Sequence, residues 1–98
     1  MRSCYTEVLS PTRIAIADVT DYYGIGKMIT RINVPMMHRG EGHGTKVLAQ
    51  ILKDADAERV NLYLEISPSD GLDYNQLEAW YLRHGFRHWM GIYRRKPK

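Results

Sequence analysis

The stretch Ile32-Asn33-Val34-Pro35-Met36-Met37-His38-Arg39-Gly40-Glu41-Gly42-His43-Gly44 decides how this chain folds, because it joins an apolar, strand-like segment to a helix-like one. Glycines at the alternate positions 40, 42 and 44 allow the backbone to bend tightly and bring its N–H groups close to a ligand. The start of the following helix adds unsatisfied N–H donors and the positive end of the helix dipole. Together with Arg39, this pattern predicts a cradle for a phosphorylated ligand, most simply a pyrophosphate.

Two other phosphate-binding loops do not fit this stretch. The nucleoside triphosphate loop requires Gly-Lys-Ser or Gly-Lys-Thr, whereas Gly44 is followed by Thr45-Lys46. The dinucleotide fingerprint has a different glycine spacing and an acidic residue at the end of the next strand. A flexible loop without a ligand stays open as an alternative, since alternating glycines alone are a weak signal.

The hydrophobic pattern on either side of the loop predicts five strands and two helices. The expected strands are Cys4–Leu9, Arg13–Asp18, Lys27–Val34, a segment around 60–66, and Phe86–Tyr93. A helix is expected over Gly44–Ala57, because Val47, Leu48, Ile51, Leu52 and Ala55 share one helical face. The order β-β-β-α-β-α-β predicts an α/β fold of the mixed-sheet kind, mostly antiparallel, with a central parallel pair formed by the β-α-β step.

The second helix has recognisable signals at both of its ends. Asp73, followed three residues later by Gln76, is typical of a capping arrangement at a helix start. Gly85 is expected to end the helix in a left-handed conformation.

Size, charge and cysteine usage limit the class of protein. The 98 residues predict a single domain over 1–98, and no apolar run reaches the length of a membrane span. Cys4 is the sole cysteine, and the polar start of the chain has no signal-peptide core, so we expect a cytoplasmic protein. Of the 14 basic residues, four lie in 94–98; without them, 10 basic residues stand against 11 acidic ones. We expect 94–98 to be a frayed basic tail, which disfavours a nucleic-acid partner.

Two separated motifs resemble the GNAT superfamily of acetyltransferases. The run Arg39–Gly44, placed behind Ile32-Asn33-Val34, is similar to the family's Arg/Gln-x-x-Gly-x-Gly/Ala motif. The run Ala79–Phe86 is similar to its aromatic-Tyr-x-x-x-Gly-Phe segment. The resemblance implies an N-acetyltransferase that uses acetyl-coenzyme A (acetyl-CoA) as co-substrate. The family's usual first strand and first two helices are missing, which implies an open acceptor cleft or a wall borrowed from a second subunit in a homodimer.

The resemblance also implies which residues hold acetyl-CoA. Main-chain N–H groups of the glycine loop would hold the pyrophosphate, and the strand end around Val34 would pair with the pantetheine arm. The implied cofactor-binding residues are Ile32, Asn33, Val34, Arg39, Gly40, Glu41, Gly42, His43, Gly44, Thr45, Asn75 and Tyr81.

Two residues are candidates for catalysis. The resemblance implies that Tyr81 is a general acid, which gives a proton to the leaving thiolate. The alternative is that Tyr81 only packs beside Trp80. Glu65 is a candidate general base, directly or through water, although a solvated strand face explains this residue equally well.

Other chemistries have less support. The four histidines, His38, His43, His84 and His88, have no ligand-like spacing and no cysteine pair nearby, so we expect no metal site. The acceptor amine is not specified by the sequence. The alternative function is a non-catalytic binding module that keeps the GNAT-like fold and engages a protein or nucleic-acid partner.

Overall fold

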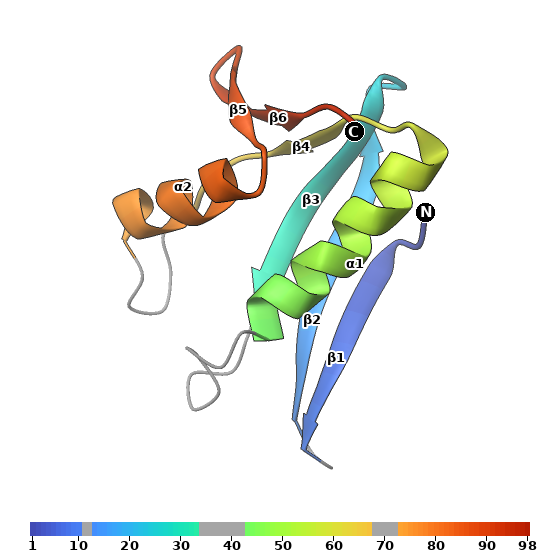
Figure 1. Cartoon of the computed structure of the whole chain (residues 1–98), viewed down its shortest axis with the longest axis vertical. Helices are drawn as coiled ribbons and strands as arrows, with labels where there is room; N and C mark the ends of the chain where they lie inside the picture. The colour runs from blue at the N-terminus through green and yellow to red at the C-terminus, as the bar shows by residue number, and fades with distance from the viewer. Residues whose placement is uncertain (11–12, 34–42, 68–72) are drawn as a thin grey trace.

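The computed structural model describes residues 1–10, 13–33, 43–67 and 73–98, and Figure 1 shows the arrangement of the elements. The elements in chain order are β1 (Cys4–Ser10), β2 (Arg13–Tyr22), β3 (Gly26–Asn33), α1 (His43–Glu58), β4 (Leu62–Leu64), α2 (Tyr74–Arg83), β5 (Arg87–Trp89) and β6 (Ile92–Arg95).

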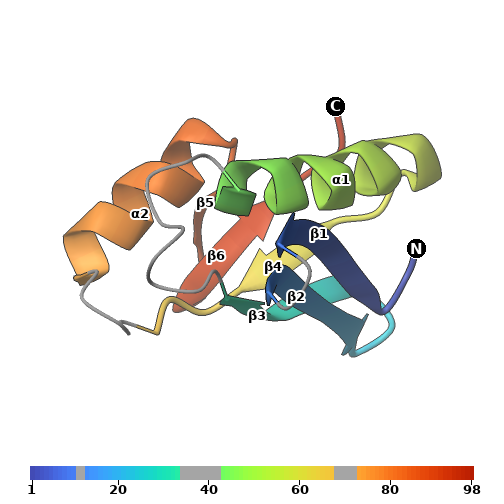
Figure 2. The same cartoon turned by 90° about the horizontal axis from the view of Figure 1, so that it is seen from below.

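The strands form one six-stranded mixed sheet in the order β1-β2-β3-β4-β6-β5. The pairing is antiparallel throughout except between β3 and β4, which run parallel on either side of the crossover through α1. Both helices lie on the same face of the sheet, as Figure 2 shows, so the opposite face carries no helix. The mixed sheet with a central parallel pair is therefore confirmed.

The core lies between the sheet and the helices. The helical face expected from the sequence is confirmed: Val47, Leu48, Ile51 and Ala55 are fully buried, and Leu52 packs against them. Alternate strand residues meet that face, among them Tyr5, Ala15, Ala17, Val19, Leu62 and Leu64. Removing apolar surface of this extent from water is the main force that holds the layers together.

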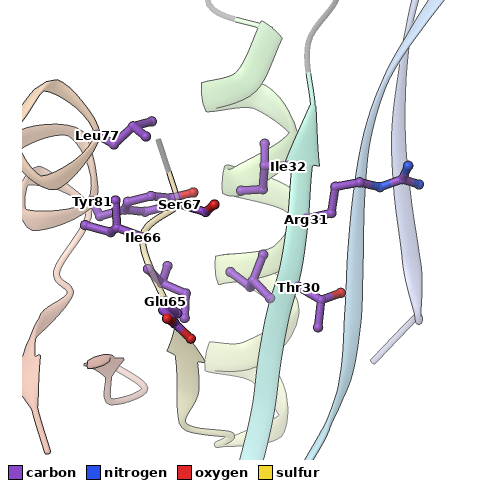
Figure 3. A pocket seen from close by; sticks show the side chains of 10 residues that line it. Thr30, Arg31, Ile32, Glu65, Ile66, Ser67, Leu77 and Tyr81 are labelled. Atoms are coloured by element: carbon purple, nitrogen blue, oxygen red, sulfur yellow. The ribbon is translucent and has the colours of Figure 1, made fainter. Parts of the chain in front are cut away.

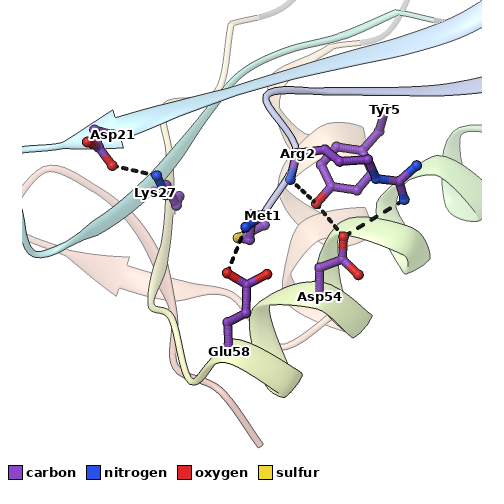
Figure 4. A network of polar contacts seen from close by, with 7 residues as sticks. All are labelled: Met1, Arg2, Tyr5, Asp21, Lys27, Asp54 and Glu58. Carbon is purple, nitrogen blue, oxygen red and sulfur yellow. Dashed lines mark hydrogen bonds and ion pairs between the residues drawn. The ribbon is translucent and has the colours of Figure 1, made fainter.

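Polar contacts fasten the start of the chain to α1 (Figure 4). The Tyr5 hydroxyl donates a hydrogen bond to Asp54 at 2.6 Å, and the Met1 amino group pairs with Glu58 at 2.7 Å. The Arg2 guanidinium lies over the Tyr5 ring, 4.4 Å from its centroid. Burial of the phenol, followed by the hydrogen bond to Asp54, raises the pKa of Tyr5 to about 12. The edge strand β1 and the residues before it are thus held by contacts between residues 49 and 57 positions apart in the sequence.

The ends of α2 agree with the sequence signals. The Asp73 side chain accepts a hydrogen bond from the Gln76 N–H, and the Gln76 side chain accepts one from the Asp73 N–H, which is a complete capping box. Gly85 follows the helix with φ at +94°, the left-handed region that glycine enters without a steric cost.

The last segment differs from the sequence prediction. The single strand expected over Phe86–Tyr93 is instead the hairpin β5–β6, with a two-residue turn at Met90 and Gly91. Methionine is not typical of the first position of such a turn, so Gly91 alone was a weak turn signal. The strand β6 also includes Arg94 and Arg95, and the expected frayed tail over 94–98 is therefore wrong for these two residues.

Neither helix in the described part of the chain has the length and apolar character that crossing a membrane requires.

Candidate functional site

The parallel strands β3 and β4 meet at one end and separate toward the other. Their pairing covers two positions, Lys27 with Leu62 and Met28 with Tyr63. The close approach depends on Gly26, because a Cβ there would lie 2.4 Å from the Asn61 carbonyl oxygen. Beyond Met28, no described strand pairs with β3 on this side, and a wedge opens between residues 29–32 and 64–67.

This wedge holds a cavity of about 250 Å³ (Figure 3). Its lining is formed by Ile29, Thr30, Arg31, Ile32, Leu64, Glu65, Ile66, Ser67, Leu77 and Tyr81. One side is thus formed by β3 and the other by the end of β4 with the segment 65–67 after it. The helix α2 closes the space with Leu77 and Tyr81, which share a helical face at i, i+4 spacing. The Arg31 guanidinium pairs with Asp18 at 2.8 Å and points away from the cavity.

Tyr81 brings a buried phenol to this cavity. The residue is 9% exposed, and its hydroxyl points from α2 toward the space beside β3 in Figure 3. The rings of Trp80 and Phe86 pack against Tyr81 at centroid distances of 4.9 and 5.6 Å. Burial alone raises the pKa of Tyr81 to about 12, so the phenol keeps its proton even at alkaline pH values where an exposed tyrosine ionises.

Glu65 reaches the same cavity from the extended segment directly after β4. It follows the buried Leu64 and precedes the buried Ile66, so strand alternation places its carboxylate on the sheet face away from the helices. The side chain is exposed, yet it lines the wedge beside the separated strands. The structure therefore brings the two candidate catalytic residues, Tyr81 and Glu65, to one cavity.

Two of the implied acetyl-CoA residues, Ile32 and Tyr81, line the wedge. Asn33 is the exposed last residue of β3 and is not among the lining residues. His43 is the first residue of α1 and is followed by the half-buried Gly44. Asn75 is exposed on the first turn of α2 and is also not among the lining residues.

Thr45 links the start of α1 to α2. Its hydroxyl oxygen accepts a hydrogen bond of 3.1 Å from the Trp80 indole N–H. This contact holds the first turn of α1 next to the helix that carries Tyr81. The remaining implied residues, Val34, Arg39, Gly40, Glu41 and Gly42, lie outside the described residues.

Sequence reasoning missed part of the cavity lining, and it missed the hydrogen bond by which Trp80 holds the start of α1. Ile66, Ser67 and Leu77 carry no motif, and their apolar or small side chains predict only strand, turn and helix packing. They line a cavity because β3 and β4 diverge. That divergence depends on how the two strands pair, so neither strand's own sequence shows it. Trp80 was expected only as a packing neighbour of Tyr81.

Within the described residues, no three histidine, cysteine, aspartate or glutamate side chains lie together in a way that could hold a metal ion.

The chain has a GNAT-like α/β fold, in which two parallel strands separate and leave a wedge between them. No protein-family model and no curated protein matches the sequence. Among solved structures, the chain is similar to the anti-CRISPR protein AcrVA5, with a TM-score of 0.69 and 14% identity, over 95% of this chain and 98% of that one. It is also similar to an acetyltransferase of the GNAT family from Staphylococcus aureus Mu50, with a TM-score of 0.67 and 16% identity. That match covers 86% of this chain and 60% of the acetyltransferase.

Proposed function

We propose that this protein is an N-acetyltransferase that moves an acetyl group from acetyl-CoA to a primary amine by direct attack. The observation that carries the proposal is the buried Tyr81 hydroxyl at the place where two parallel strands separate. The fold shared with a GNAT acetyltransferase supports it.

The wedge suits the thioester end of acetyl-CoA. Its walls include the apolar side chains of Ile29, Ile32, Ile66 and Leu77, which match the methylene groups of a pantetheine arm. Beyond Met28, the peptide groups of β3 that face the wedge have no partner in β4, so an extended ligand can pair with them as an added strand. The amide groups of such a ligand would satisfy those donors and acceptors.

The start of α1 suits the pyrophosphate. The main-chain N–H groups of its first turn, from His43 onward, have no partner within the helix, and they lie at the positive end of its dipole. We assign the pyrophosphate to these N–H groups together with the glycine loop and Arg39, as the sequence predicted. The Trp80–Thr45 hydrogen bond fixes this end of α1 relative to Tyr81.

The two candidate catalytic residues then have complementary tasks. Glu65 accepts the proton that the amine must lose, directly or through one water molecule. The nitrogen forms a bond to the thioester carbonyl carbon while the carbon–sulfur bond breaks. Tyr81, whose raised pKa of about 12 keeps it protonated well above neutral pH, gives its proton to the departing sulfur. The products are an N-acetylated amine and the free thiol of coenzyme A.

Calorimetry with acetyl-CoA tests this proposal directly. The folded protein should bind one equivalent, and a hundredfold excess over Kd should stabilise it by about 2.7 kcal/mol. Arg39→Ala and Gly42→Glu should remove both effects, because the first loses a phosphate contact and the second fills the loop with a negative side chain. Arg59→Ala, after the far end of α1, is the matched control and should bind normally. A folded wild-type protein that gives no binding heat contradicts the proposal.

A second candidate function rests on AcrVA5, which corresponds to this chain over nearly its whole length. We infer as the alternative that the protein blocks CRISPR immunity by engaging a protein component, with or without acetyl transfer. A plasmid-interference assay in cells that carry a CRISPR system, comparing wild type with Tyr81→Phe, distinguishes inhibition that needs acetyl transfer from inhibition by binding alone. Inhibition that survives in the variant favours a binding module, and inhibition that requires Tyr81 favours an enzyme.

A further inference from the structure

A row of aromatic rings crosses the sheet face that carries no helix. Tyr63 lies on this face because its strand neighbours Leu62 and Leu64 point into the core. Ring centroids join Tyr63 to Tyr22 at 4.7 Å and to Trp89 at 5.1 Å, and Tyr22 to Tyr23 at 4.8 Å. We call these four residues the aromatic seam. It connects the β2–β3 hairpin to the β5–β6 hairpin, which are remote in sequence.

The β2–β3 end of the seam carries a bulky residue in an unfavourable backbone conformation. Tyr23 and Gly24 form a two-residue hairpin turn with φ at +48° and +72°, where asparagine or glycine is the usual first residue. The left-handed conformation costs a tyrosine about 1–2 kcal/mol. The Tyr23 side chain is 88% exposed, so its burial does not offset that cost.

The β5–β6 end repeats the same arrangement. Met90 and Gly91 have φ at +48° and +85°, and the Met90 side chain is 83% exposed. The aromatic seam thus has an exposed, bulky residue in a left-handed turn at each end: Tyr23, which belongs to it, and Met90, which follows Trp89. Backbone strain that folding does not require points to a role in contact with another molecule.

The positive charge of the chain is concentrated beside the seam. Residues 87–98 contain Arg87, Arg94, Arg95, Lys96 and Lys98 and no acidic residue, whereas the rest of the chain holds 9 basic and 11 acidic residues. Among these five side chains, and within the described residues, Arg95 alone forms an ion pair with a carboxylate. We call residues 87–98 the basic hairpin.

Arg94 joins the seam to this charge. Its guanidinium lies 5.2 Å from the centroid of the Trp89 ring. Arg87 is opposite Arg94 in the register of β5 and β6, so both side chains leave the same face of the hairpin. The surface therefore combines the exposed ring of Tyr23 and the half-buried rings of Tyr22 and Trp89, which pack on the buried Tyr63, with a row of positive charge.

We propose that the aromatic seam and the basic hairpin bind a single strand of nucleic acid. Bases stack on aromatic faces regardless of their identity, and the phosphates between them are held by arginine and lysine, which is the chemistry that this surface offers. Tyr23 and Trp89 supply the stacking faces, and Arg87, Arg94 and Lys96 contact phosphates. Charge disfavours a second copy of the chain as the occupant, because a symmetric contact would bring two basic hairpins together. The proposal does not depend on acetyl transfer.

Fluorescence anisotropy with a labelled dT20 oligonucleotide tests it. Wild type should bind saturably and more tightly than it binds the corresponding duplex. The affinity should fall with salt, with a slope of about −2 to −3 in log K against log salt concentration, for three or four phosphate contacts. Arg94→Glu should weaken binding at least tenfold. The matched control, Lys53→Glu on the exposed side of α1, should change the affinity less than twofold.

Tyr23→Asn separates binding from folding, because asparagine suits the turn better than tyrosine. We expect this variant to bind dT20 at least fivefold more weakly while it melts at a higher temperature than wild type. Three results would overturn the proposal: no saturable binding of dT20, equal losses in Arg94→Glu and Lys53→Glu, or unchanged affinity in Tyr23→Asn. Sedimentation velocity provides a further test. A dimer that Tyr23→Asn dissociates, without dT20 binding, would assign the surface to a second copy and also overturn it.

Discussion

Arg95 donates two hydrogen bonds to the carboxylate of Asp56, with Nη1–Oδ1 at 2.8 Å and Nη2–Oδ2 at 3.2 Å. The pair ties β6 to the last part of α1. The Arg95 side chain is nearly completely buried, and its Nε also donates to the His84 carbonyl at the end of α2. One arginine therefore joins both helices to the final strand, and it keeps α2, which carries Tyr81, in place against the sheet.

Removing the carboxylate should destabilise the protein. Asp56→Asn leaves a buried guanidinium without its charged partner, and we expect the free energy of unfolding to fall by about 2–3 kcal/mol. This expected loss is smaller than the usual cost of breaking a fully buried ion pair, because the Asp56 side chain is partly exposed to water. Urea unfolding at pH 7 measures it. Lys96→Ala, which removes an exposed charge from the same end of the chain, should change stability by less than about 0.5 kcal/mol.

The same pair should make stability depend on pH. The hydrogen bonds from Arg95 hold the pKa of Asp56 below its usual value. A carboxyl group whose pKa is lowered by folding stabilises the protein above its unfolded pKa, about 4, and loses that contribution as pH falls through the folded value. The difference in unfolding free energy between wild type and Asp56→Asn should thus be constant from about pH 7 to 5 and shrink below about pH 4. A difference that grows on acidification contradicts the assignment.

Tyr81→Phe tests the general acid. The variant keeps the ring that packs between Trp80 and Phe86 and loses the hydroxyl at the wedge. We expect kcat to fall by about 10²–10³-fold, while the Kd of acetyl-CoA changes little. Steady-state kinetics and calorimetry on the same preparation provide the two values. Unchanged turnover, with chemistry shown to limit the rate, removes Tyr81 from the mechanism.

The raised pKa of Tyr81 predicts the alkaline side of the pH–rate profile. Since the phenol has a pKa of about 12, it remains protonated between about pH 7 and 10. Activity should therefore not decline in that interval through loss of the Tyr81 proton. A decline near pH 9 that disappears in Tyr81→Phe is the result that contradicts this prediction.

Gly26→Ala should disturb the junction of β3 and β4. A Cβ at this position would lie 2.4 Å from the Asn61 carbonyl oxygen and 2.7 Å from the Tyr63 ring, so the strands must move apart. We expect a loss of about 2–3 kcal/mol in urea unfolding, because backbone is less able to shift than a flexible side chain. Gly26→Ala should also weaken acetyl-CoA binding, since the wedge opens from this junction. Ala57→Gly, on the exposed side of α1, controls for general destabilisation and should leave binding unchanged.

Tyr23→Asn should stabilise the protein, by about 1 kcal/mol, because asparagine accepts the left-handed conformation more readily than tyrosine. Differential scanning calorimetry measures the change. Gly24→Asn, at the second turn position, serves as the comparison and should be neutral or slightly destabilising. A lower melting temperature for Tyr23→Asn would show that the exposed ring contributes to folding.

Much of the fold was predictable from local pattern. The apolar face of α1, the capping box at Asp73 and the left-handed Gly85 each follow from a few residues that interact with near neighbours along the chain. The parallel pair followed from a general rule, since a strand-helix-strand step must return the chain in the same direction. The hairpin of β5 and β6 was not predictable, because Met90 gives no turn signal and its conformation is imposed by the strands on either side.

For the site, the sequence named Tyr81, Glu65 and Ile32, and the structure places all three around one cavity. It did not name Ile66, Ser67 or Leu77, which carry no motif of their own. The glycine loop remains a prediction from the sequence. The cavity itself depends on how far β3 and β4 stay paired. The position at which two strands stop pairing cannot be predicted from the sequence of either strand.

The amino-acid sequence by itself determined the order of strands and helices as far as α2, and the identity of the chemically capable side chains, because periodicity, capping and backbone preference act over a few neighbouring residues. Only the tertiary structure decided which of those side chains meet. The wedge beside Tyr81, the burial of Arg95 against Asp56 and the aromatic seam from Tyr23 to Trp89 all join segments far apart in the chain. Their positions follow from the packing of the sheet against two helices, where the removal of apolar surface from water outweighs local preference.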